Sequence, residues 1–302
     1  MNAGRYGSRE ARRAAVVFFV LLVLTVVPPF TLVTTWLFPI PLLTFWWLQM
    51  HRTALALTGV VAAAMWLTGL GLAGLFAAVG VGFVAFVMAE ALRGGDTPFA
   101  PIITGSLVFI MMELVMLAFT RWTGVDLFQS LAAEVERSLR EQGAFGLDDA
   151  GVRNLAAQMV QWTRLMFPSV IAVMAMLVAT VNLVSARLLL RRLLPERPFL
   201  SAVRLPVSVV VLYVLALGAV LAGWPKEWPI VWQTVNNAAF LAGLFLGVQG
   251  VSFLWRRVRG RAGQYVWLAL MIAGSLFRPI SSIYVVLGVM DVMQQHRRNP
   301  LR

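Results

Sequence analysis

The sequence predicts an all-α protein, a polytopic transmembrane helical bundle of about 8–10 membrane segments with an amphipathic helical hairpin outside the bilayer. Two observations predict this class. Of the 302 residues, 60% are hydrophobic and 13% are charged, about half the charge of a soluble domain. Several apolar runs also reach the roughly 20 residues that a helix needs to cross a bilayer. These runs do not alternate as β-barrel strands do, so the segments must be helical.

The first 120 residues are predicted to form an N-terminal transmembrane bundle. Prolines divide the first apolar block into two predicted helices, at about 14–34 and 36–50. The prolines are Pro28, Pro29, Pro39 and Pro41. Glycines divide block 54–92 into two close-packed helices, and these are Gly69, Gly71 and Gly74. Residues 93–98 are a predicted turn, and the fifth span covers about 101–120.

Residues 121–161 are predicted to form an extracytoplasmic amphipathic helical insert. Charge is dense and mixed here, and apolar residues recur at helical spacing, among them Leu127, Leu131, Val135, Leu139, Val152, Leu155 and Met159. Asp148 and Asp149 are candidate N-caps for the second helix of the hairpin. That helix is predicted to run on into the sixth span, about 162–190, with a kink at Pro168.

The remaining chain divides into two predicted parts. Residues 162–205 form a long transmembrane helix and a basic cytoplasmic loop, and residues 206–302 form a C-terminal transmembrane region. Spans are expected at about 206–223 and 231–254. The last apolar block, 264–293, is broken by Arg278-Pro279 and is either one kinked helix or two short ones.

Basic residues predict the orientation of the chain. With the N-terminus in the cytoplasm, the cytoplasmic segments hold 18 of the 25 basic residues, which the positive-inside rule favours. The same rule favours a cytoplasmic C-terminus, which requires an even number of crossings and hence two helices in the last block. The alternative is one long terminal helix with the C-terminus outside.

The sequence lacks the residues and motifs that several classes of function require. There is no cysteine, which excludes disulfides and thiolate metal sites. The sequence has no Walker A, Gly-x-Ser-x-Gly or His-Glu-x-x-His motif. We therefore expect no enzyme activity, no metal and no cofactor. The net charge of +12 reflects arginines that flank apolar segments and face anionic lipid, not nucleic acid.

Glu113 and Arg278 are the candidate substrate- or ion-binding residues. Glu113 lies near the middle of the fifth span, where a carboxylate costs about 2.5–3.5 kcal/mol on insertion scales. It can bind a ligand or couple a proton or cation, or it can hold two helices together as a protonated or paired glutamate. Arg278 can pair with Glu113 or bind an anionic group. If the last block is a hairpin, Arg278 instead lies at the membrane interface and snorkels.

Polar residues within the spans are expected to pack helices together through interhelical hydrogen bonds, and these are Asn182, Asn236, Asn237 and Gln249. Glu90 and Asp291 lie near cytoplasmic helix ends, where neighbouring arginines can pair with them. The Gly-x-x-x-Gly motif at Gly243 and Gly247 permits close helix approach, within the chain or between chains.

The order of these features resembles the YybS-like family of bacterial membrane proteins over nearly the whole chain. The residues that carry the resemblance are the proline-interrupted N-terminal pair, the charged insert, and a long helix with Asn182 that runs into a basic segment. The motifs Leu246-Gly247-Val248-Gln249-Gly250 and Leu287-Gly288-Val289-Met290-Asp291 follow. The N-terminal part is distantly similar to S components of energy-coupling-factor transporters, and a broader similarity reaches cell-shape proteins of the MreD type.

The resemblance implies two functions. The first is a small-molecule-binding or transport module of the bacterial cytoplasmic membrane that relies on separate ATPase and coupling subunits. The second is a membrane scaffold in cell-envelope or cell-shape assembly, in which the hairpin offers its apolar face to an envelope partner.

Overall fold

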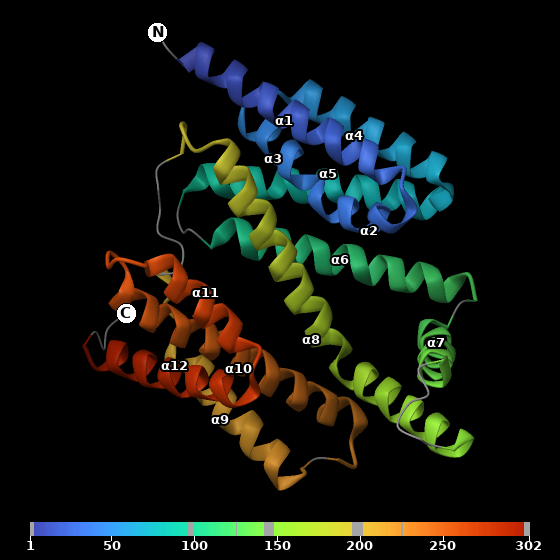
Figure 1. The fold of residues 1–302 in the computed structure, drawn as a ribbon, viewed down its shortest axis with the longest axis vertical. Helices are drawn as coiled ribbons and strands as arrows, with labels where there is room; N and C mark the ends of the chain where they lie inside the picture. The colour runs from blue at the N-terminus through green and yellow to red at the C-terminus, as the bar shows by residue number, and fades with distance from the viewer. Residues whose placement is uncertain are drawn as a thin grey trace. The chain divides into compact units, whose positions relative to one another are not determined.

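The computed structural model describes residues 3–95, 99–124, 126–141, 148–194, 202–224 and 226–298. Within these ranges all regular secondary structure is helical, as predicted (Figure 1). Residues 96–98 of the predicted turn, together with Pro225, Arg197 and Arg302, lie outside the described residues.

The chain forms two compact units. Unit 1 comprises Met1–Val152 and Val170–Arg197, and unit 2 comprises Arg153–Ser169 and Pro198–Arg302. One long helix contributes to both units. The four-part division of the sequence into 1–120, 121–161, 162–205 and 206–302 stays a prediction.

The start of unit 1 has three helices where two were predicted: α1 (Ala3–Thr25), α2 (Pro28–Leu37) and α3 (Pro39–Trp47). The predicted bounds 14–34 and 36–50 are therefore wrong. Proline is favoured in the first turn of a helix, because its missing N–H has no intrahelical partner there in any case. Both α2 and α3 begin with a proline, so prolines that were read as interruptions instead start new helices.

The predicted split of the second block is confirmed. Helix α4 (His51–Met65) leads through the π-helical turn η1 (Trp66–Leu70) into α5 (Gly71–Gly94). Gly69 and Gly71 have φ of 87° and 52°, which side chains disfavour, and the chain folds back there. A Cβ at Gly82 of α5 would lie 2.7 Å from the Thr58 side chain of α4, so the two arms pack closely.

Helix α3 is the buried centre of unit 1. All its residues over 39–45 are buried, as expected for a helix that is apolar all round. Ala14 of α1, Phe45 of α3 and Ala54 of α4 form one core cluster. Helix α6 (Ala100–Trp122) packs against α5 and confirms the predicted fifth span.

The insert contains two helices, as predicted. In α7 (Leu127–Glu141), Asp126 caps the N-terminus by accepting from the Phe128 N–H at 2.9 Å. Helix α8 (Asp149–Leu189) begins at its own cap, since the Asp148 carboxylate accepts from the Gly151 N–H at 2.8 Å. It runs for 41 residues through Pro168, so the second arm and the sixth span are one helix.

Besides part of α8, the described residues of unit 2 form α9 (Val207–Ala222), α10 (Pro229–Val258), α11 (Gln264–Ser275) and α12 (Arg278–Arg298). Their core includes Val210, Leu246 and Val292. Helices α11 and α12 meet at a bend of 110°, which confirms the predicted break before Pro279.

Four described helices are long and apolar enough to cross a membrane, or five if the bent pair α11–α12 is one span. They are His51–Gly94, Ala100–Trp122, Asp149–Leu189 and Pro229–Val258. This number is lower than the expected 8–10 for three reasons. Helices α2, α3 and α9 are too short to span, α1 carries four arginines in its first half, and the folded-back α4–α5 pair counts once. The polytopic all-α class itself is confirmed.

Candidate functional site

Pro168 interrupts the backbone hydrogen bonding of α8. Proline has no N–H to donate to the carbonyl four residues earlier, which here belongs to Arg164. Gln233 of α10 supplies a replacement, since its Nε2 donates to the Arg164 carbonyl oxygen at 2.9 Å. A membrane helix tolerates proline when a neighbouring helix satisfies the freed group in this way.

Asn237 lies one turn after Gln233 and binds the same stretch of α8. Its Nδ2 donates to the Leu165 carbonyl at 2.8 Å, and its Oδ1 accepts from the Ser169 N–H at 2.9 Å. Asn236 is different, because its Nδ2 donates at 2.8 Å to the Trp232 carbonyl of its own helix. Of the two predicted packing asparagines in α10, Asn237 is thus the one that joins α10 to α8.

Asn182 has the corresponding place in unit 1. Its Nδ2 donates to the Trp36 carbonyl of α2 at 2.9 Å and to the Val178 carbonyl of α8 at 2.8 Å. Trp36 lies in the last turn of α2, where carbonyls lack intrahelical partners. The buried Oδ1 of Asn182 accepts no hydrogen bond from the described residues.

A buried polar cluster joins α10 to α12, and we call it the Asp291 cluster. Asp291 Oδ2 accepts from Gln249 Nε2 at 2.5 Å, Arg256 Nη2 at 2.5 Å and Gln295 Nε2 at 2.7 Å. Arg256 also donates to Ser252 Oγ at 2.8 Å. The predicted pairing of Asp291 with a neighbouring arginine is confirmed. Arg256 and Asp291 both lie near the C-terminal ends of their helices, so those ends lie on the same side of unit 2.

Two glycines allow this approach. A Cβ at Gly250 of α10 would lie 1.9 Å from the Tyr284 carbonyl oxygen, and one at Gly288 of α12 would lie 1.9 Å from the Leu246 carbonyl oxygen. No side chain fits at either position. Both glycines stand in the short motifs around Gln249 and Asp291, and the fold brings these two motifs together.

The Gly-x-x-x-Gly motif predicted close helix approach at Gly243 and Gly247, but the closest approach is at Gly250 and Gly288. Gly243 faces the Tyr213 ring of α9, at 3.1 Å from a built Cβ, and Gly247 meets Val285 of α12 at an ordinary 3.9 Å. The sequence signal for the closer contact is a glycine near a buried polar residue, because Gly250 directly follows Gln249 and Gly288 lies three residues before Asp291.

Glu113 lies half-buried in α6. The neighbouring residue Met112 packs against Gly80 of α5. A Cβ built on Gly80 would lie 2.4 Å from the Met112 sulfur. The Glu113 carboxyl itself makes no hydrogen bond or ion pair with the described residues. Glu113 belongs to unit 1 and Arg278 to unit 2, so the pairing of these two residues stays a prediction.

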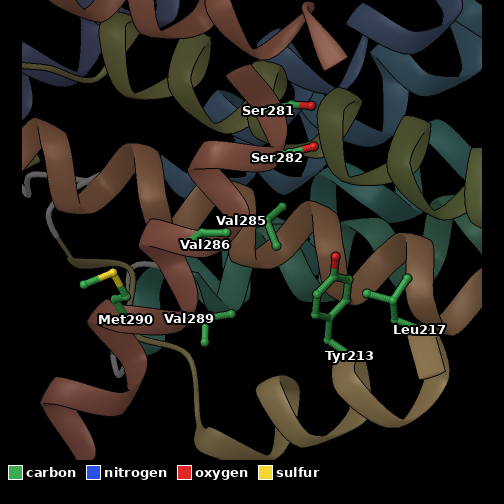
Figure 2. Close-up of a pocket in the computed structure, with 8 residues that line it drawn as sticks. All are labelled: Tyr213, Leu217, Ser281, Ser282, Val285, Val286, Val289 and Met290. Carbon is green, nitrogen blue, oxygen red and sulfur yellow. The ribbon is translucent and has the colours of Figure 1, made fainter. Parts of the chain in front are cut away.

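Arg278 is exposed at the first position of α12. A groove of about 410 Å³ begins one turn further along this helix and lies between α12 and α9 (Figure 2). Its lining is mostly apolar and comprises Tyr213, Leu217, Ser281, Ser282, Val285, Val286, Val289 and Met290. The serine and tyrosine hydroxyls give one end of the groove a polar character.

Unit 1 contains a larger cavity, of about 760 Å³, lined by residues of α1, α2, α4 and η1 that include Leu22, Val60 and Leu67. Its two threonine hydroxyls donate to backbone carbonyls, Thr31 to Thr25 at 2.9 Å and Thr68 to Met65 at 2.9 Å. The wall is therefore mostly apolar.

Within the described ranges, no group of three or more His, Cys, Asp or Glu side chains is arranged to hold a metal ion. The predicted site residues thus fall at separate places. Asn237 and Gln249 join helices of unit 2, Asn182 joins helices of unit 1, and Glu113 and Arg278 have side chains without described partners.

The apolar helices and their buried polar joints define a multi-pass α-helical membrane protein. The chain belongs to the family described as "Predicted membrane protein (DUF2232)", whose model matches residues 14–292. It is 25% identical over 218 residues to "Uncharacterized protein YybS" of Bacillus subtilis (strain 168), which covers 67% of this chain and 68% of that protein. No solved structure matches the chain. The predicted YybS-like family is confirmed.

Proposed function

We propose that this protein is a small-molecule-binding or transport module of the bacterial cytoplasmic membrane. In this proposal it resembles an S component, relies on separate ATPase and coupling subunits and carries out no catalysis itself. The observation that carries the proposal is the Glu113 carboxyl, which lies within span α6 without a described partner.

A carboxylate in a span is costly, at about 2.5–3.5 kcal/mol on insertion scales. The structural alternative for Glu113 is a protonated or paired carboxyl that holds two helices together, and the described residues provide no hydrogen bond or ion pair for the paired form. Apart from a proton, a ligand, a cation or a partner subunit can then stabilise this group, and these three favour a binding role. Unit 1 also has the 760 Å³ cavity, whose lining does not include Glu113 and whose volume lies within the 300–1,000 Å³ typical of ligand sites.

The test is native mass spectrometry of the protein gently extracted from its own membrane. We expect a retained small molecule or ATPase subunits with the wild type, and loss of the small molecule with Glu113→Gln. Glu141→Gln is the matched control, because it removes a carboxylate from the exposed end of α7. A small molecule that Glu113→Gln retains in full would remove Glu113 from the proposal. A wild type without non-lipid ligand or ATPase subunit would overturn the transport function.

A scaffold is the second candidate, and α7 favours it. This helix has an apolar stripe, yet it contains no buried residue, so its apolar side is available to an envelope partner. Deletion of 125–158 should then remove a co-purifying envelope protein and leave any retained small molecule unchanged. A partner that still co-purifies with the deletion variant would contradict the scaffold.

A further inference from the structure

The groove of Figure 2 has an apolar length and a polar end. Along α12, Val285, Val289 and Met290 follow Ser281 at helical spacing, so one wall spans ten residues, a length of about 14 Å at a rise of 1.5 Å per residue. Leu217 of α9 lies opposite (Figure 2). A wall of this length and polarity suits a hydrocarbon chain.

The polar end has a defined set of hydrogen-bonding groups. The Ser281 and Ser282 hydroxyls donate to the Arg278 carbonyl at 2.9 and 3.0 Å, so their oxygens are left to accept from a ligand. The Tyr213 hydroxyl has no hydrogen-bond partner among the described residues and can donate. Figure 2 shows it directed toward the serine end of the groove.

Arg278 adds a positive charge at this end. It precedes Ser281 and Ser282 by three and four residues, a spacing that places all three on one face of α12. Its side chain is exposed, and its guanidinium makes no ion pair or hydrogen bond with the described residues. The charge is therefore free to meet an anion at the polar end.

We propose that this groove binds one anionic phospholipid of the surrounding membrane, with a phosphate at Arg278 and Tyr213 and an acyl chain along α12. The serine oxygens suit a headgroup that also carries hydroxyl donors, as phosphatidylglycerol does. A zwitterionic lipid has no net charge for Arg278, so charge complementarity selects the anionic headgroup. The site lies in unit 2 and goes beyond the function proposed for Glu113 of unit 1.

The test compares lipid retention by the purified, delipidated full chain. The protein in detergent is incubated with phosphatidylglycerol or with phosphatidylcholine of the same acyl chains, and native mass spectrometry counts the bound lipids. We expect about fivefold greater retention of phosphatidylglycerol by the wild type, the order of effect of one basic residue at an anionic lipid. Arg278→Gln should abolish this preference, and Arg261→Gln, an exposed arginine in the turn after α10, should keep it.

A second pair of variants tests the acyl-chain wall. Val286 lines the groove and Val214 does not, and both side chains are 58% exposed, so tryptophan can be accommodated at either. Val286→Trp should lower phosphatidylglycerol retention relative to Val214→Trp, because the larger side chain occupies space along the acyl-chain wall. Equal retention by these two variants would overturn the site, as would a wild type that does not discriminate between the lipids or an Arg278→Gln variant that still does. Glu113→Gln should leave phosphatidylglycerol retention unchanged, which separates this test from that of the proposed function.

Discussion

The side-chain oxygen of Asn237 accepts a hydrogen bond from the backbone N–H of Ser169, 68 residues earlier in the chain. Ser169 follows Pro168 directly, at the point where α8 is weakened. The Asn237 amide thus supplies hydrogen bonds to backbone groups of α8 and in doing so joins α10 to α8. The polar side chains of α10 therefore lie opposite the stretch of α8 whose backbone hydrogen bonding Pro168 interrupts.

Asn237→Ala should lower the free energy of unfolding by about 1–2 kcal/mol, because it removes the acceptor of the buried Ser169 N–H and the shorter of the two hydrogen bonds that α10 donates to the Leu165 carbonyl. Asn236 is the matched control. Both asparagines are 7% exposed, but among the described residues the Asn236 side chain bonds only within its own helix. Asn236→Ala should therefore cost no more than about 0.6 kcal/mol. Reversible denaturation in mixed micelles measures both, and equal losses would contradict the assigned role of Asn237.

Asp291→Ala should destabilise the protein by about 1–3 kcal/mol, since three donors lose their common acceptor. Glu90 is the control. It also pairs with one arginine, Arg93, but its side chain is 45% exposed against 8% for Asp291. Water replaces an exposed ion pair at little cost, so Glu90→Ala should lose less than about 1 kcal/mol. The same denaturation assay ranks the two, and a larger loss from Glu90→Ala would show that burial of the Asp291 cluster contributes little.

Gly288→Ala should lower the free energy of unfolding by about 1–3 kcal/mol, because the added methyl group would lie 1.9 Å from the Leu246 carbonyl oxygen and force α10 and α12 apart. Gly218→Ala in α9 has the opposite expectation. No atom lies within 4 Å of a Cβ there, so alanine should stabilise the helix by about 0.5–1 kcal/mol. Thermal unfolding in detergent checks the two signs, and a neutral Gly288→Ala would mean that the helices are not in backbone contact.

The orientation can be tested with single cysteines, because the chain has none of its own. Glu141→Cys places a thiol at the exposed end of α7, and Arg261→Cys places one in the turn between α10 and α11. The positive-inside rule predicts that an impermeant maleimide labels the Glu141→Cys variant on intact cells. It should label Arg261→Cys only after permeabilisation. The reverse pattern would place the N-terminus outside.

Helix breaks were predictable where one residue restricts its own backbone. The fold-back at Gly69 and Gly71 and the break before Pro279 follow from local conformational preferences. Pro28 and Pro39 show the limit of this reasoning. A proline either interrupts a helix or starts one, and the sequence reading took it as an interruption where the structure has a start.

The polar residues show a different limit. The composition of the spans identified Asn237 and Gln249 as buried hydrogen-bonding groups, but it identified no partner for either. Their partners lie 68 and 42 residues away. The neighbours Asn236 and Asn237 are chemically identical, and the helix rotation alone decides which one faces α8.

The sequence by itself determined the membrane class, the polar joints within the spans and the helix breaks at glycine and at Pro279, because hydropathy and backbone restriction are properties of short segments. Only the tertiary structure decided that the Gln249 and Asp291 motifs meet, that Gly250 and Gly288 allow them to, and that Glu113 lacks a partner among the described residues. These relationships depend on which helix faces pack together. Packing is set by the shapes of side chains far apart in the chain, and no local pattern encodes it.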